Sequence, residues 1–233
     1  MNTKLKVLSL GLLAMVAIGA FAAVNATAES GGHFVSAVEK TVVTATEEQG
    51  TSHHTELKVV GLEKGITCPH VLYDATAATT TVTSLTFTPT YPNNCVTAGT
   101  ATKVPVDHNE CGYTFSVKKK AVTSHSTVSI TCPAGKSIVI THPECEITVP
   151  AQALNGVSYS NILENGVHTV TAELTIENIS VSFHKGLCTL LGTAHLATFK
   201  GSVTARGFTD ESTPTEPYKH SVNPVSITAT SIE

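Results

Sequence analysis

The stretch Cys111–Val149, CGYTFSVKKKAVTSHSTVSITCPAGKSIVITHPECEITV, carries the clearest fold signal in the chain. Residues 111–117 and 126–132 alternate apolar and polar side chains, which is the period of a half-buried β-strand. In a hairpin with Cys111 opposite Cys132, aromatic and aliphatic side chains share one face, and glycine, serine and threonine share the other. A slip of one residue would mix the two faces, so the pattern predicts this register.

Turn signals divide the remainder of this stretch into two more strands. Pro133-Ala134-Gly135 precedes residues 136–141, and His142-Pro143-Glu144 precedes residues 145–149. The loop 118–125 is polar and is expected to be the solvated tip of the first hairpin. Four consecutive strands with short turns predict an antiparallel meander.

The apolar segments outside this stretch are also short and β-branched, with many threonines, which favours strands over helices. Side chains alternate again from Leu85 to Tyr91, and residues 225–229 predict a last strand. Residues 209–217 are polar and predict a surface loop. We therefore expect an all-β fold, an antiparallel β-sandwich-like arrangement stapled by disulfide bonds.

One long segment, 168–185, changes its alternation part of the way along. The apolar residues have even numbers from Val170 to Ile176 and odd numbers from Ile179 to Phe183. This change near Glu177-Asn178 predicts a β-bulge, or a strand that breaks between two sheets.

The N-terminus has the pattern of a secretory signal peptide. Lys4 and Lys6 precede an apolar run from Val7 to Ala23, and the small residues Ala26-Thr27-Ala28 follow it. We expect residues 1–28 to form a signal helix that is cleaved, so that the mature chain begins near Glu29 and is secreted or extracytoplasmic. Residues 29–233 are then the mature β region, either a single large domain or two packed β subdomains.

Charge argues against nucleic acid as a partner. Cleavage after residue 28 leaves 205 of the 233 residues and changes the formal net charge from −4 to −6, because two lysines leave with the signal. The chain has one arginine, Arg206. A basic face for phosphates is therefore not expected. Since no second long apolar run follows the signal, we also expect no integral membrane span in the mature chain.

Six cysteines in an exported chain predict three disulfide bonds. Directly opposed residues of an antiparallel pair lie within disulfide range, so the hairpin register predicts the bridge Cys111–Cys132. If each remaining cysteine pairs with the nearest one in the sequence, Cys68 bonds to Cys95 and Cys145 to Cys188. The sequence also allows these partners to be exchanged.

Metal-site patterns are weak. A blue-copper site uses two histidines, a cysteine and usually a methionine, but Met1 and Met15 both lie in the signal. The candidate zinc donors lack a paired C-x-x-C arrangement, so they are better explained as surface histidines and disulfide cysteines. The candidate calcium loop lacks the required glycine and spacing, so it is better explained as a polar turn. These donors are His53-His54, Cys68-Pro69-His70, His142-x-x-Cys145 and Asp107-x-Asn109-Glu110. We expect no metal and no cofactor.

Catalytic signatures are equally weak. Gly135-Lys136-Ser137 lacks the earlier glycine and the following helix of a phosphate-binding loop, and the nucleophile pattern Gly-x-Ser-x-Gly does not occur. The mature chain has three aspartates, Asp74, Asp107 and Asp210. A Ser-His-Asp set or a carboxylate pair assembled by folding stays open as an alternative.

Three sequence segments together resemble a group of uncharacterised exported proteins of soil actinobacteria. They are Cys111-x-Tyr113-x-Phe115, Cys132-Pro133-Ala134-Gly135-Lys136-Ser137-Ile138 and Cys145-x-Ile147-x-Val149. The resemblance spans much of the mature chain and implies export and a β fold. The group has no assigned activity and no catalytic residues, so the resemblance assigns no function.

The sequence thus predicts a non-catalytic extracellular or envelope-associated β protein that serves adhesion or ligand binding, with a protein or cell-envelope component among its candidate partners. The alternative is a secreted hydrolase whose site is assembled by the fold. A cleft that holds a serine or glutamate against a histidine would favour the hydrolase, and an apolar surface without such a cluster would favour binding.

Overall fold

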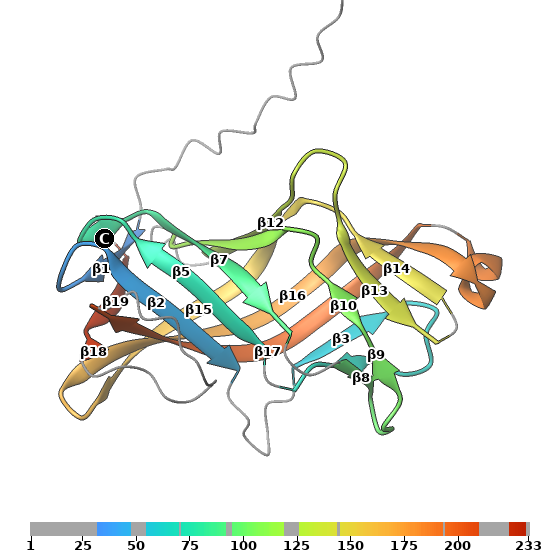
Figure 1. Cartoon of the computed structure of the whole chain (residues 1–233), viewed down its shortest axis with the longest axis horizontal. Helices are drawn as coiled ribbons and strands as arrows, with labels where there is room; N and C mark the ends of the chain where they lie inside the picture. The colour runs from blue at the N-terminus through green and yellow to red at the C-terminus, as the bar shows by residue number, and fades with distance from the viewer. Residues whose placement is uncertain are drawn as a thin grey trace, which may run out of the picture.

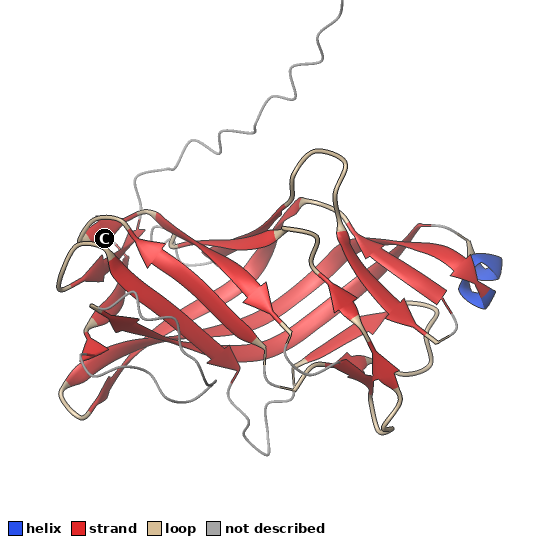
Figure 2. Cartoon of the chain, viewed as in Figure 1, coloured by secondary structure: helices blue, strands red, loops and turns tan. Residues whose placement is uncertain are grey.

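The computed structural model describes residues 32–47, 55–69, 71–91, 95–118, 126–143, 145–192, 194–209 and 224–231. Most of the described residues are in strands, as the all-β prediction requires, and the one helix among them is a short 3₁₀ turn, η1 (Leu187–Leu191). Figure 2 shows this turn at one end of an elongated molecule. The expected signal helix lies outside the described residues, as do the tip residues 119–125 and the loop residues 210–217.

The strands are numbered in chain order. They are β1 (Gly32–Ser36), β2 (Thr41–Glu47), β3 (Glu56–Val59), β4 (Ile66–Thr67), β5 (Leu72–Ala77), β6 (Thr81–Val82), β7 (Ser84–Thr90), β8 (Cys95–Thr97), β9 (Lys103–Val104), β10 (Val106–Asp107), β11 (Gly112–Ser116), β12 (Ser126–Thr131), β13 (Ile138–His142), β14 (Cys145–Val149), β15 (Gln152–Glu164), β16 (Val167–Gly186), β17 (Ala194–Phe208), β18 (Pro224–Val225) and β19 (Ile227–Ser231).

The first ring of strands closes on one half of a long hairpin made by β16 and β17. Its hydrogen-bonded order is β16, β15, β12, β11, β7, β5, β2 and β17, and β17 pairs back to β16. The pairs from Val170–Ala205 to Ile176–Phe199 belong to this half of the hairpin. Figure 1 shows β16 and β17 running along the length of the molecule, with β2, β5, β7 and β15 at one end.

The second ring closes on the other half of the same hairpin. Its order is β17, β3, β4, β8 and β9 on one side, and β16, β14, β13 and β10 on the other. Strands β9 and β10 meet at Pro105, and the backbone N–H of Thr141 in β13 donates a hydrogen bond of 2.9 Å to the Pro105 carbonyl. Both edges of the second ring therefore join at one proline.

A sandwich-like arrangement is not confirmed, because hydrogen bonds connect the strands into closed rings instead of separate facing sheets. The four-strand meander is wrong at one junction. Strand β12 pairs with β11 and β15, while β13 pairs with β14 and β10. The long strand β15 occupies the edge of β12 that β13 was expected to use. The turn at Pro133-Ala134-Gly135 instead carries the chain from the first ring to the second.

The expected phase change in the long strand is a bulge. The β16–β17 register shifts between Ile176 and Ile179, and Asn178 has a φ of 59°. One extra residue in β16 turns the odd-numbered side chains inward beyond this point, as two residues of a bulged strand oppose one on its partner. The bulge therefore lets both rings bury the same face of the hairpin.

The three disulfide bonds pair as expected. Cys111–Cys132 joins the ends of β11 and β12, whose register runs from Gly112–Thr131 to Ser116–Thr127. Cys68–Cys95 links the neighbouring strands β4 and β8, and Cys145–Cys188 ties η1 to β14. All six cysteines are bridged. Three disulfides indicate an oxidising, extracytoplasmic compartment.

A small sheet closes the outer end of the first ring. Strand β1 pairs with β19 and with β6, which joins the first and last described strands of the chain. We call β19–β1–β6 the cap sheet. The Asn161 side chain of β15 fastens it to the ring, because its amide donates to the Ala229 carbonyl (2.9 Å) and its oxygen accepts the Ala229 N–H (2.8 Å).

Candidate functional site

The interior of the first ring contains a cavity of about 140 Å³, lined by thirty residues. Most of them come from the inner face of the first ring, and Phe34 and Ile227 come from the cap sheet. Val106, Ile138 and Ile140 of the second ring line it as well. The cavity therefore extends from the cap sheet to the junction of the two rings.

Small side chains help to explain the space inside the first ring. Eight strands closed into a ring leave an interior that side chains can just fill, or that can hold one small molecule. Three alanines, Ala45, Ala172 and Ala205, line the cavity from the wall that β2, β16 and β17 form. In the second ring, Phe183 and Ile147 are fully buried and do not border the cavity.

The lining is apolar and uncharged. None of the thirty lining residues is an acid, a base, a histidine or a serine. The polar groups among them belong to one threonine, Thr55, and to four tyrosines, since Cys68 is in a disulfide. Such a lining favours an uncharged apolar occupant, because burying a charge without a partner is very costly.

Three of the tyrosines cluster at the end of the first ring that faces the second. The hydroxyls of Tyr91 and Tyr113 lie 3.1 Å apart and hydrogen-bond, and the rings of Tyr73 and Tyr113 pack edge to face with centroids 6.0 Å apart. Each of the three is partly exposed. Figure 1 shows the adjoining ends of β5 and β7 pointing toward β3 and β10. This cluster gives the cavity a polar rim.

The fourth tyrosine, Tyr159, lies at the other end of the cavity. It is on the inner face of β15, opposite Ala172, and the ring of Phe34 packs edge-on against it with centroids 5.4 Å apart. The hydroxyl oxygen has less than 1 Å² of accessible surface and no hydrogen-bond partner among the described residues. Burial raises the pKa of the Tyr159 hydroxyl far above its ordinary value. The group therefore stays protonated.

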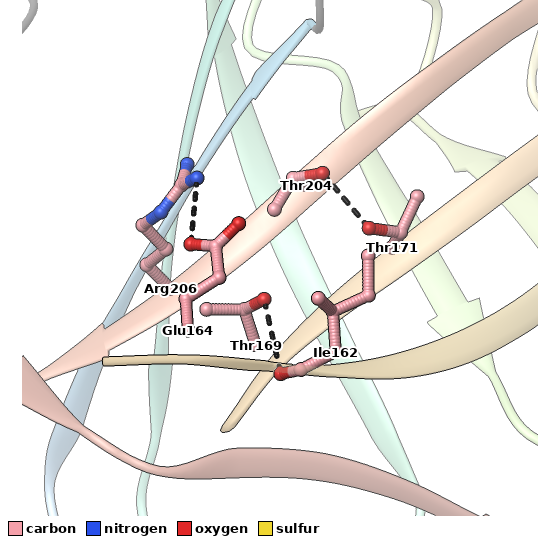
Figure 3. A network of polar contacts seen from close by, with 6 residues as sticks. All are labelled: Ile162, Glu164, Thr169, Thr171, Thr204 and Arg206. Atoms are coloured by element: carbon pink, nitrogen blue, oxygen red, sulfur yellow. Dashed lines mark hydrogen bonds and ion pairs between the residues drawn. The ribbon is translucent and has the colours of Figure 1, made fainter. Parts of the chain in front are cut away.

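The outer face of the same wall is polar, as Figure 3 shows. Thr171 and Thr204 are buried and share a hydrogen bond of 2.9 Å, and Arg206 forms an ion pair of 3.2 Å with Glu164. Both ion-pair partners are about two-fifths exposed, so solvent screens the pair and its stabilisation is small. These contacts hold β15, β16 and β17 together outside the cavity and offer it no chemical group.

The metal-site patterns of the sequence do not form a site in the described residues, where no group of three or more candidate ligands comes together. His142 and Cys145 are cross-strand neighbours, but the sulfur of Cys145 is bonded to Cys188. The acidic turn is a turn as expected: the Asp107 carboxylate accepts the N–H of Asn109 at 2.9 Å. His53, His54, His70 and Asp210 lie outside the described residues.

The catalytic patterns fare no differently. Gly135-Lys136-Ser137 is followed by strand β13, whereas a phosphate-binding loop is followed by a helix. Asp74 and Asp107 are exposed, and neither borders the cavity. Sequence reasoning did not find the cavity or Tyr159. Alternation could have placed Tyr159 inward only with the bulge at Gly156, which shifts the β12–β15 register and has a φ of 112°.

Within the described residues no helix is long and apolar enough to span a membrane. Comparisons of the chain with family models, curated proteins and solved structures found no match.

Proposed function

We propose that this protein is an exported, non-catalytic binding protein that holds a compact apolar molecule in the cavity of its first ring. The observation that carries the proposal is the cavity itself, about 140 Å³ with thirty lining residues and no charge among them. A protein cavity of about 150 Å³ lined by aliphatic and aromatic side chains stays dry and binds benzene-sized molecules. We therefore infer a ligand of similar size.

The lining favours binding over the alternative hydrolase at this cavity. A hydrolytic site needs a nucleophile or an activated water beside a general base, usually histidine or a carboxylate. Those residue types are missing from the thirty lining positions, and the polar groups present are phenols and one threonine hydroxyl. The three disulfides support a role outside the cytoplasm, where the signal pattern of residues 1–28 would direct the chain.

Binding is expected to raise the melting temperature of the exported protein in solutions saturated with toluene or cyclohexane. A ligand that binds only the native state stabilises it in proportion to RT ln(1 + [L]/Kd). Substitution of an inward alanine by a large side chain, Ala45→Phe, should fill the cavity and weaken toluene binding at least about tenfold, a change of about 1.4 kcal/mol. Calorimetric titration and thermal melts with and without toluene measure both effects.

Ala153→Phe is the matched control, because Ala153 is an exposed residue of the same antiparallel framework. It should leave toluene binding unchanged. Ala45→Leu repeats the test with a smaller side chain if Ala45→Phe lowers the melting temperature severely. A wild-type protein whose melting temperature does not respond to either hydrocarbon would contradict the proposed function.

A further inference from the structure

We propose that the η1 turn is a membrane-docking tip, which inserts Leu187 and Leu190 into the interface of a lipid bilayer. The inference goes beyond the proposed function and does not depend on the cavity. It starts from exposure, because Leu187 and Leu190 are 68% and 83% exposed, the highest values among the large apolar side chains of the described residues. Exposed apolar side chains that lie together mark sites of contact with proteins or membranes.

The two leucines share one side of the turn. In a 3₁₀-helix, which has three residues per turn, side chains at positions i and i+3 eclipse each other, so Leu187 and Leu190 lie one above the other. Cys188, which follows Leu187 in the sequence, is only 2% exposed and is bonded to Cys145 of β14. The disulfide therefore fastens the turn to the second ring and leaves both leucines in solvent.

The place of η1 in the molecule favours a lipid surface over a protein partner. The turn joins β16 to β17, and Figure 2 shows it at one end of the elongated molecule. Each partner in a stable protein complex normally buries about 800 Å², contributed by roughly 20–30 residues. A turn of five residues at a tip does not offer that area to a second copy of the chain. Binding to a bilayer has no such threshold, because its strength scales with the apolar area inserted.

The charge around the tip suits insertion into a bilayer. The sequence has no aspartate or glutamate from residue 178 to residue 209, although acidic residues outnumber basic ones in the whole chain. Residues 186–199 carry no lysine or arginine either, so the tip enters an apolar medium without burying a charged side chain. Lys185 directly precedes the tip; its side chain is 78% exposed and pairs with Glu146 at 2.7 Å. Solvent screens this pair, which leaves the ammonium group accessible to lipid phosphates.

Several polar groups of the turn are bonded within it. The Thr189 hydroxyl donates to the Gly186 carbonyl at 2.8 Å, and the Gly192 N–H donates to the Thr189 carbonyl at 3.2 Å. The Gly192 carbonyl oxygen lies 3.1 Å from Nε2 of His195, which donates to it when this nitrogen carries the proton. Internal bonds reduce the cost of moving the turn out of water, because lipid offers few partners to backbone groups.

A single tryptophan can report on the tip, because the chain has none of its own. In the variant Leu190→Trp, vesicles of phosphatidylcholine and phosphatidylglycerol should shift the tryptophan emission to shorter wavelength, and lipids with brominated acyl chains should quench it. Tryptophan is well suited to the membrane interface, so this substitution preserves docking. Leu163→Trp is the matched control, because Leu163 is 61% exposed but lies beside the β15–β16 turn, at the opposite end of β16. Its emission should not respond to the vesicles.

Removal of both leucines measures their contribution to binding. In flotation assays, the double variant Leu187→Ser/Leu190→Ser should bind the same vesicles at least about tenfold more weakly than the wild-type protein, because it loses most of the inserted apolar area. Its melting temperature should match that of the wild-type protein, since both side chains are exposed. Leu163→Ser should bind the vesicles as the wild-type protein does.

Two results would overturn the inference directly: wild-type protein that does not float with the vesicles, or a double variant that floats as well as the wild-type protein. A wild-type dimer in sedimentation experiments that the two serines convert to a monomer would also overturn it, because the leucines would then belong to an interface between copies of the chain. Neither leucine lines the cavity, so toluene binding should be the same in the double variant and the wild-type protein. The two proposals can therefore fail independently.

Discussion

Reduction of the three disulfide bonds is expected to unfold the protein at ordinary temperature. Each bridge closes a loop of 21 to 43 residues and should stabilise the fold by roughly 2–4 kcal/mol, mainly by restricting the unfolded chain. The three together are comparable with the whole net stability of a typical protein, about 5–15 kcal/mol. Far-UV spectra and thermal melts with and without a phosphine reductant should show the loss.

One bridge can be removed alone. The double variant Cys111→Ser/Cys132→Ser leaves the two bridges of the second ring in place and should lower the melting temperature by about 6–12 °C, which corresponds to roughly 3 kcal/mol in a chain of this length. The single variant Cys111→Ser is a poorer test, because the freed Cys132 can exchange with the other bridges. A fully reduced protein with six alkylated thiols and an unchanged melting temperature would contradict the prediction.

Substitution of Gly156 by alanine is expected to destabilise the protein by about 3–5 kcal/mol. Gly156 has a φ of 112°, which side chains rarely adopt, and a Cβ at this position would overlap the carbonyl oxygen of Thr175 in β16. The obstacle is backbone of a central strand, so it cannot move aside as a side chain could. Chemical denaturation curves of the variant and the wild-type protein, compared in their midpoints and slopes, measure the change in the free energy of unfolding.

The variant Gly166→Ala measures the cost of a positive φ without the steric overlap that a Cβ at position 156 would cause. Gly166 also has a positive φ, 81°, but open space surrounds the position of its missing Cβ. This variant should lose only about 1–2 kcal/mol, the conformational term alone. Similar losses in the two variants would show that β15 and β16 can separate at the bulge, contrary to the close approach in the structure.

Local pairing was predictable from the sequence because it depends on side chains near each other along the chain. The alternation of residues 111–117 and 126–132 fixed the register of β11 and β12 and with it the Cys111–Cys132 bridge. The change of phase near Asn178 predicted the bulge in β16. Another local signal was overlooked: Asn165-Gly166 both have positive φ and form the two-residue turn of the β15–β16 hairpin.

The closure of the rings could not be predicted in the same way. Whether β12 pairs with β13 or with β15 depends on which strand reaches its free edge, and both candidates have the same apolar alternation. The cavity could not be predicted from the sequence either, because it depends on the pairing of β2, β17 and β16, which places three alanines that are far apart in the chain side by side on one wall. Nothing in the sequence distinguishes Tyr159, and that its hydroxyl has no hydrogen-bond partner among the described residues is visible only in the folded structure.

The cap sheet also constrains when the cavity can be completed during biosynthesis. Strand β1 contributes Phe34 to the cavity wall, yet its partner β19 begins only at Ile227, whereas β1 ends at Ser36. Strand β2 likewise pairs with β17, and the paired residues are more than 150 positions apart in the chain. Pairings between such distant segments form slowly, because the intervening chain must first be brought together. The cavity wall is therefore complete only after β17 and β19 have been synthesised and have paired with β2 and β1.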